Sequence, residues 1–148
     1  MSVLAVTVDA TAAAATEDAV LVDELVALEK SKLDPWYGEA STAVYLEGLA
    51  EDSTYMDPWI PKKLKGAEVR EYLAAFEGNI PNLEYEIVDA TADRRGDIVI
   101  FTYDITHPAD PVTGEVVPRW MVTKILNRVG DGWEVIHTHY GLPVPFEG

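Results

Sequence analysis

The chain has 148 residues, of which 26 are Asp or Glu and 11 are Lys or Arg, so its formal net charge at pH 7 is −15. That length is typical of one domain with a hydrophobic core of its own. A charge of this sign repels the phosphates of nucleic acid and the anionic lipids of a membrane surface, so we expect neither as a partner. The chain contains no cysteine, which excludes disulfides, thiolate chemistry and zinc sites built on Cys.

The first 15 residues are small and low in complexity, and they show no periodic apolar pattern. We therefore expect a flexible tail at 1–15 and a single domain at 16–148. The apolar run from Val3 to Val8 has no basic flank and is too short to span a bilayer. From this we predict neither a signal peptide nor a membrane anchor, and a cytoplasmic location.

Three helices are predicted in the first half of the chain. Thr16 followed by two acids predicts a helix start, and Pro35 predicts an end near Leu33. A second, short helix fits residues 41–52, and a third fits the segment between Gly66 and Gly78, where apolar residues recur at helical spacing. A strand with the sequence "STYMDPW" separates the second and third helices and ends at Asp57.

From residue 83 onward the apolar period changes to two, which is the period of a strand. The segments "LEYEIVDA", "IVIFTYDITH", "VVPRWMVTKILNR" and "WEVIHTHY" are separated by turn-forming residues. They predict an antiparallel meander of four strands. Because the helices precede the strands, the predicted fold class is α+β.

Asp57 has two interpretations. An Asp before Pro commonly forms a turn at the end of a strand. A carboxylate flanked by Tyr55 and Trp59 would also be partly desolvated, which suits a general base in a pocket. The residues themselves leave both interpretations open.

Lys124 lies in a strand with apolar residues on both faces, so it needs a carboxylate partner. Asp104, on the preceding strand, is the candidate for a cross-strand pair, and the alternative is a lysine that extends to solvent at the margin of the sheet. The basic segment "PKKLKG" has no glycine-rich phosphate cradle, so we interpret it as a solvated loop.

His137 and His139 lie two residues apart on a strand and therefore on one face, where two imidazoles could meet a metal ion. A catalytic metal needs a third ligand, and His107 is the only other histidine. We favour structural or hydrogen-bonding histidines and predict no metal site, with a metal hydrolase as the least favoured interpretation.

The order of these parts resembles the nuclear transport factor 2-like superfamily, and in particular its SnoaL-like family. The resemblance spans about residues 17–143 and is carried by "YLEGLAEDSTYMDPW", "RWMVTKILNRVGDGW" and "VIHTHYG". The superfamily also contains ketosteroid isomerases and the association domain of calcium/calmodulin-dependent kinase II. The resemblance implies a cone of three N-terminal helices on a strongly curved, mainly antiparallel sheet that encloses a pocket. It also implies a homodimer formed through the outer face of that sheet.

In the isomerases the Asp of a similar Asp-Pro strand end is the general base, which implies that role for Asp57. Lys124 occupies the position of the acid that holds the oxyanion in those enzymes, and no tyrosine lies between Glu17 and Leu33 in the first helix. We therefore predict Asp57 as a base and Lys124 as the group that stabilises an oxyanion. The predicted substrate-binding residues are Tyr45, Tyr55, Trp59, Thr102, Asp104, Trp120 and Tyr140.

The function that this pattern favours is a cyclase, isomerase or dehydratase that needs no cofactor. Its substrate would be a small, hydrophobic molecule that contains a carbonyl group or resembles a polyketide. The alternative is a dimeric module that binds a small molecule or a protein without chemistry.

Overall fold

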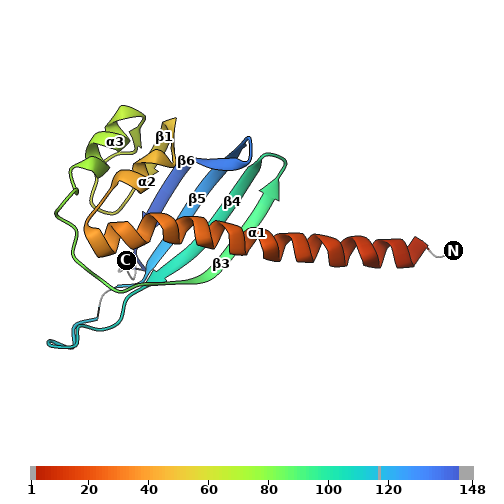
Figure 1. Cartoon of the computed structure of the whole chain (residues 1–148), viewed down its shortest axis with the longest axis horizontal. Helices are drawn as coiled ribbons and strands as arrows, with labels where there is room; N and C mark the ends of the chain where they lie inside the picture. The colour runs from red at the N-terminus through yellow and green to blue at the C-terminus, as the bar shows by residue number, and fades with distance from the viewer. Residues whose placement is uncertain (1–2, 117, 144–148) are drawn as a thin grey trace, which may run out of the picture.

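The structure, a computed structural model, describes residues 3–116 and 118–143, with side chains from residue 18 onward. Three helices and six strands form one α+β unit (Figure 1). The helices are α1 (Val3–Glu39), α2 (Ala43–Glu47) and α3 (Ala67–Ala74). The strands are β1 (Leu49–Met56), β2 (Leu64–Lys65), β3 (Glu86–Arg95), β4 (Ile98–Thr106), β5 (Trp120–Val129) and β6 (Gly132–Gly141). In the part of the chain so described, no helix is both long and apolar enough to cross a membrane.

The six strands form one curved, unclosed sheet in the order β2-β1-β6-β5-β4-β3. Its last four strands are the antiparallel meander that the period of two predicts. Strand β1 joins it parallel to β6, so the segment that ends at Asp57 lies beside the last strand of the chain. Figure 1 shows α1 crossing one face of the sheet, with α2 and α3 at the end where β1 lies. We call the face packed against α1 the inner face and the opposite one the outer face.

The core lies between α1 and the inner face. Because side chains alternate along a strand, every second residue of β4 points toward α1 and is almost completely buried. These residues are Val99, Phe101, Tyr103 and Ile105. Helix α1 contributes residues spaced by four along one face, and these are Leu21, Leu25, Glu29 and Leu33. A carboxylate therefore stands in the middle of an apolar stripe.

Helix boundaries differ from the sequence prediction. Helix α1 begins at Val3 rather than at Thr16, and it continues through Pro35 to Glu39. A proline inside a helix removes one backbone hydrogen-bond donor, but the helix can continue past it with a kink. The helix ends where Ala40 takes a left-handed conformation, with φ of 51°, and the Ser41 N–H donates to the Pro35 carbonyl. Flexibility of the first 15 residues stays a prediction.

The second helix is shorter than expected, because "LAED" belongs to the strand. Helix α2 covers only Ala43–Glu47, and β1 begins at Leu49. Arg70 of α3 explains part of this change, since its guanidinium donates to the carbonyls of Leu46 (3.1 Å) and Leu49 (2.9 Å). The third helix forms where it is predicted, with Val69 and Leu73 buried.

A buried ion pair joins α1 to the middle of the sheet. The Lys124 ammonium donates to both carboxylate oxygens of Glu29, at 3.0 and 2.8 Å, and both side chains are about 1% exposed. Tyr103 donates its hydroxyl to the same carboxylate at 2.7 Å. Lys32, also buried, approaches it at 3.4 Å. The interior here holds two ammonium groups and one carboxylate.

The expected pair of Lys124 with Asp104 is wrong. Lys124 lies opposite Phe101 in the register of β4 and β5, so it points inward, whereas Asp104 lies opposite Met121 and points outward. Asp104 instead accepts a hydrogen bond from Arg119 at 2.7 Å. The alternative interpretation, in which Lys124 extends to solvent at the margin of the sheet, is also wrong, because Lys124 is fully buried.

Replacing the carboxylate should destabilise the fold strongly. Glu29→Gln leaves two buried ammonium groups with no anion, and we expect it to lower the free energy of unfolding by about 3–5 kcal/mol. Lys32→Met keeps the Glu29–Lys124 pair and the apolar stem while removing the excess cation, so its stability should equal or exceed that of the wild type. Urea unfolding followed by circular dichroism measures both. A Glu29→Gln variant as stable as the wild type would contradict the role of the ion pair.

Candidate functional site

A cavity of about 370 Å³ opens between the helices and the inner face, where β1, β4 and β6 end and β5 begins. Its walls are largely aromatic and come from several elements. These aromatic residues include Trp36, Tyr45, Tyr55, Trp59, Trp120 and Tyr140. Among the described residues that line the cavity, Asp57 is the single carboxylate and no Lys or Arg is present. The cavity therefore combines an apolar interior with one anionic group.

Asp57 lies directly after β1 and is about 9% exposed. Its Oδ2 accepts hydrogen bonds from the hydroxyls of Tyr55, at 3.0 Å, and Tyr72, at 2.7 Å. Its Oδ1 accepts the backbone N–H of Trp59 at 2.8 Å, which is the hydrogen bond of an Asx turn. Asp57 thus forms the turn and also lines the cavity, and its role as a general base stays a prediction. A carboxylate oxygen accepts two hydrogen bonds, and Oδ1 has only this one within the described structure.

The two tyrosines around Asp57 remain protonated donors at neutral pH. Burial raises the pKa of Tyr55 well above its ordinary value, and the neighbouring Tyr45 and Asp57 raise it further. Burial also raises the pKa of Tyr72, and the hydrogen bond and charge of Asp57 add to this effect. Asp57 is therefore held in place by neutral hydroxyls and a backbone amide, and no Lys or Arg of the described residues contacts it.

A second pair of tyrosines forms another part of the wall. The hydroxyls of Tyr45 and Tyr140 lie 2.9 Å apart and share one hydrogen bond. The Tyr140 ring lies 6.0 Å from the rings of both Tyr55 and Trp120, so aromatic contacts connect this pair to the surroundings of Asp57. Burial raises the pKa of Tyr45 far above its ordinary value, and the Glu29 charge adds to this effect.

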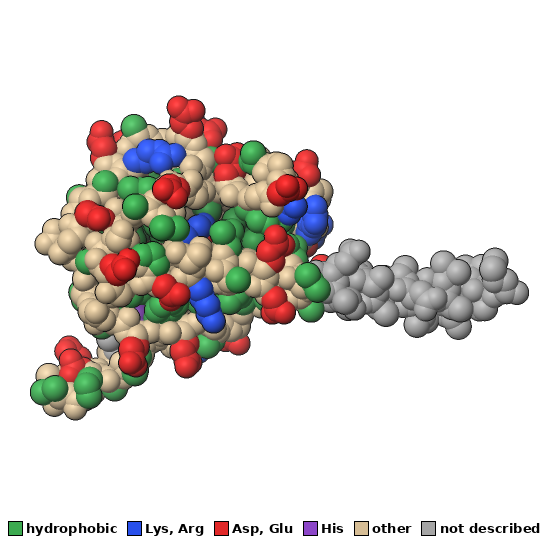
Figure 2. Space-filling view, viewed as in Figure 1, with side chains coloured by type: hydrophobic (Ala, Val, Ile, Leu, Met, Phe, Trp, Pro, Cys, Tyr) green, Lys and Arg blue, Asp and Glu red, His purple; other side chains and the backbone are tan. Residues whose placement is uncertain are grey.

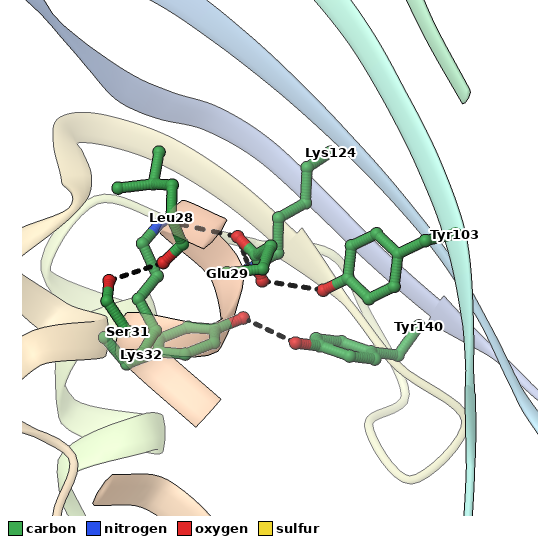
Figure 3. A network of polar contacts seen from close by, with 8 residues as sticks. Leu28, Glu29, Ser31, Lys32, Tyr103, Lys124 and Tyr140 are labelled. Carbon is green, nitrogen blue, oxygen red and sulfur yellow. Dashed lines mark hydrogen bonds and ion pairs between the residues drawn. The ribbon is translucent and has the colours of Figure 1, made fainter. Parts of the chain in front are cut away.

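Lys124 does not line the cavity. Its ammonium lies over the face of the Tyr45 ring, 4.4 Å from the centroid. Figure 3 shows the same ammonium bound by Glu29. Tyr45 lines the cavity and Lys124 does not, so a ligand in the cavity meets the tyrosine and not the ammonium. The prediction that Lys124 stabilises an oxyanion by direct contact therefore does not fit this arrangement.

Thr102 and Asp104 are also absent from the cavity, and their predicted placement on the pocket face is wrong. The register pairs Thr102 with Thr123 and Asp104 with Met121, which places both on the outer face. Thr102 contacts the hydroxyl of Thr91 there. The other predicted residues, Asp57, Tyr45, Tyr55, Trp59, Trp120 and Tyr140, all line the cavity.

The paired histidines face outward. His137 Nδ1 lies 2.6 Å from Thr54 Oγ1, and His139 is exposed. Burial lowers the pKa of His137, and the neighbouring His139 and Lys63 lower it further. Across residues 3–116 and 118–143, no group of three or more His, Asp or Glu is arranged to hold a metal ion.

Sequence reasoning missed two residues at the site. Tyr72 lies on α3, 15 residues after Asp57, and donates its hydroxyl hydrogen to that carboxylate. The helical spacing of apolar residues in this segment indicates only that Tyr72 faces inward. His107 lines the cavity rim, where it contacts the Glu84 carbonyl at 2.7 Å and packs edge-on against Tyr37. Neither contact has a signal in local spacing, because each joins separate elements.

The SnoaL-like domain model matches residues 33–145 of the chain. The chain belongs to the SnoaL-like family. That span includes every cavity residue named above, together with Lys124 but not Glu29. No curated protein matches the sequence of this family member closely enough to count as a relative.

Solved structures show where the fold of this SnoaL-like chain recurs. An NTF2-like protein of unknown function from Pseudomonas putida is similar with a TM-score of 0.71 and 18% identity, covering 87% of this chain and 91% of the other. A candidate ketosteroid isomerase from Parabacteroides distasonis has a TM-score of 0.65 and 22% identity, with 82% and 86% covered. The association domain of the C. elegans calcium/calmodulin-dependent kinase II has a TM-score of 0.67 and 16% identity, with 84% and 97% covered. Likeness at these identities shows the cone-shaped NTF2-like fold.

The excess buried cation predicts a pH dependence of stability. Burial and the neighbouring Lys124 lower the pKa of Lys32 from 10.5, against the opposing effects of Glu29 and Tyr45. Below the lowered pKa both folded and unfolded states hold the proton, so the cost of burying the charge is complete. Between that pKa and 10.5 the unfolded state binds more protons, so stability rises with pH.

We therefore expect the stability advantage of Lys32→Met over the wild type to shrink as the pH rises from 7 toward 10. Urea unfolding at a series of pH values measures the difference between the two proteins. The difference cancels the titration of groups that both share. An advantage that grows with pH would contradict the prediction.

Proposed function

We propose that this protein is an enzyme that needs no cofactor and transfers a proton on a small, hydrophobic, carbonyl-containing or polyketide-like molecule. The reaction class is that of a cyclase, isomerase or dehydratase. The observation that carries the proposal is Asp57, the single carboxylate among the described residues that line an aromatic cavity of about 370 Å³. A cavity of this kind holds a small ligand by apolar contact and leaves one group to act on it.

Asp57 would accept a proton from the carbon next to the carbonyl group. Its Oδ2 is fixed by Tyr55 and Tyr72, and its Oδ1 retains capacity for a further hydrogen. Fixed geometry of this kind lowers the cost of bringing base and substrate together. The same carboxyl group would return the proton to another carbon or to a leaving oxygen.

The Tyr45–Tyr140 pair would receive the negative charge that develops on the carbonyl oxygen. Two hydroxyls 2.9 Å apart share one hydrogen bond, and the second proton of the pair would be donated to a ligand oxygen. Burial keeps both tyrosines protonated by raising their pKa values well above the ordinary range. Neutral donors in an apolar wall stabilise an oxyanion more strongly than donors in water.

The fold neighbour described as a candidate ketosteroid isomerase supports the same reaction class by analogy. A sequence identity of 22% shows that the two proteins share the fold, and it does not show that they share the site. The proposal depends on the cavity residues of this chain.

The alternative is a dimeric module that binds a small molecule or a protein without chemistry. It is favoured by the kinase association domain among the fold neighbours and by the outer face, where Ile100 and Met121 are exposed at 38% and 46%. A second copy of the chain would cover these side chains through the outer face. Figure 2 shows acidic side chains spread over the helical side, so we propose no nucleic acid or membrane as a partner.

Asp57→Asn tests the enzyme proposal. Hydrogen–deuterium exchange at the carbon next to the carbonyl, followed by NMR in D₂O over a panel of small cyclic ketones, measures proton removal directly. We expect exchange with the wild type and a loss of roughly 100-fold or more in the variant, the scale of a general base. Ketone binding, measured by ligand-observed NMR, should persist, because Asn retains the shape of Asp.

Asp52→Asn is the matched control, since it makes the same change at an exposed position of the same strand. It should leave exchange unchanged. Ketones that bind to the wild type without exchange would contradict the enzyme proposal and favour the binding module.

A further inference from the structure

We infer that the buried Glu29–Lys124 pair positions Tyr45, so that Lys124 acts on a ligand through that tyrosine without touching it. The inference rests on the proposed function of the cavity, because it assigns the Tyr45–Tyr140 pair as its donor. Lys124 is thus a positioning residue.

The first step is that the ammonium of Lys124 has a fixed place. Both oxygens of Glu29 accept its hydrogens, at 3.0 and 2.8 Å, and neither side chain reaches solvent. Tyr103 donates to the same carboxylate, which restrains Glu29 from the side of β4 (Figure 3). An ion pair that is removed from water and joined by two hydrogen bonds cannot be broken without a large cost in free energy.

The second step is the contact between this cation and the ring of Tyr45. An ammonium 4.4 Å from a ring centroid, and removed from water, attracts the ring face with an energy above that of an exposed contact. The ring is thereby held at the position where its hydroxyl meets that of Tyr140.

The third step is the charge balance of the cluster. It allows an experiment to distinguish a Lys124 that positions Tyr45 from a Lys124 that only neutralises Glu29. With two lysines and one glutamate buried together, removal of either lysine leaves one cation with one anion. Lys124→Met and Lys32→Met therefore make the same chemical change in the same network. Among the described residues, only Lys124 lies over the face of the Tyr45 ring.

The test compares these two variants in crystal structures and in binding of 4-nitrophenol, a planar phenol whose absorption reports its ionisation. In Lys124→Met we expect the Tyr45–Tyr140 hydroxyl contact to open and the affinity for the probe to fall about 10-fold or more. In Lys32→Met we expect the contact to persist and the affinity to stay within about twofold. Tyr45→Phe should match Lys124→Met, and the double variant of both should lose no more than either alone, because both changes remove one interaction.

Equal losses in the two lysine variants, or an unmoved Tyr45 with full affinity in Lys124→Met, would overturn the inference. If the wild type does not bind 4-nitrophenol, the position of Tyr45 in the two structures decides. If Lys124→Met does not fold, the apolar triple variant Glu29→Leu/Lys32→Met/Lys124→Met takes its place, since a buried ionic cluster is often replaceable by apolar groups. It should fold with a displaced Tyr45, and an undisplaced Tyr45 would overturn the inference.

If the wild type does not exchange protons, this result counts against Asp57 as the base. It does not change the expected position of Tyr45 or the expected 4-nitrophenol affinities of the lysine variants. Within the described part of the chain, Asp57 makes no hydrogen bond or ion pair with Tyr45 or Lys124, and it is connected to them through the Tyr55 and Tyr140 rings. The positioning role and the enzyme proposal therefore fail separately.

Discussion

A carboxylate and an ammonium that are both removed from water must remain in contact, and this constraint fixes the centre of the molecule. Glu29 on α1 and Lys124 on β5 form such a pair, with the Tyr103 hydroxyl from β4 as a third member. The pair sets where α1 lies along the inner face and which face of β5 turns inward. Hydrophobic burial supplies most of the stability of such a core, whereas an ion pair specifies one arrangement among several that bury similar area.

The cavity depends on that arrangement. Because α1 is held over the sheet, its last turns place Leu33 and Trp36 in the cavity wall, and the cation of Lys124 lies behind Tyr45. The interior then has an ion-pair cluster at one side and Asp57 at another, with neutral tyrosines between them. Among the described residues, the hydrogen-bond partners of Asp57 are therefore tyrosine hydroxyls and a backbone amide.

The sequence predicts the meander, the third helix and the strand that ends at Asp57, because each has a local signal: a period of two, a helical apolar stripe, or an Asp-Pro strand end. Asp57 and the aromatic residues predicted with it line one cavity, and their part in binding a substrate stays a prediction. The extent of α1 was not predictable from Thr16 and Pro35, since a capping hydroxyl is tolerated inside a helix and a proline does not stop one in every context. The spacing of Glu29 from Leu25 and Leu33 is the local signal that a carboxylate is buried there.

The partner of Lys124 was not predictable in the same way. The long connection between β4 and β5 leaves their register open, and a shift of one residue exchanges the faces of every side chain. Placing Thr102 and Asp104 inward depended on that register, and the structure has Phe101 and Tyr103 inward instead. The contact of Glu29 with Lys124 joins residues 95 positions apart, so it is a property of the packed fold and has no local signal.

The central claim is that the aromatic cavity is the place where a carbonyl compound meets Asp57. A crystal structure of the wild type with a bound small cyclic ketone tests it most directly. The account predicts that the ketone oxygen lies within hydrogen-bond distance of the Tyr45 or Tyr140 hydroxyl and that the adjacent carbon faces Asp57. A ketone bound outside the cavity, or bound inside it with its carbonyl group directed away from both tyrosines, would contradict the account.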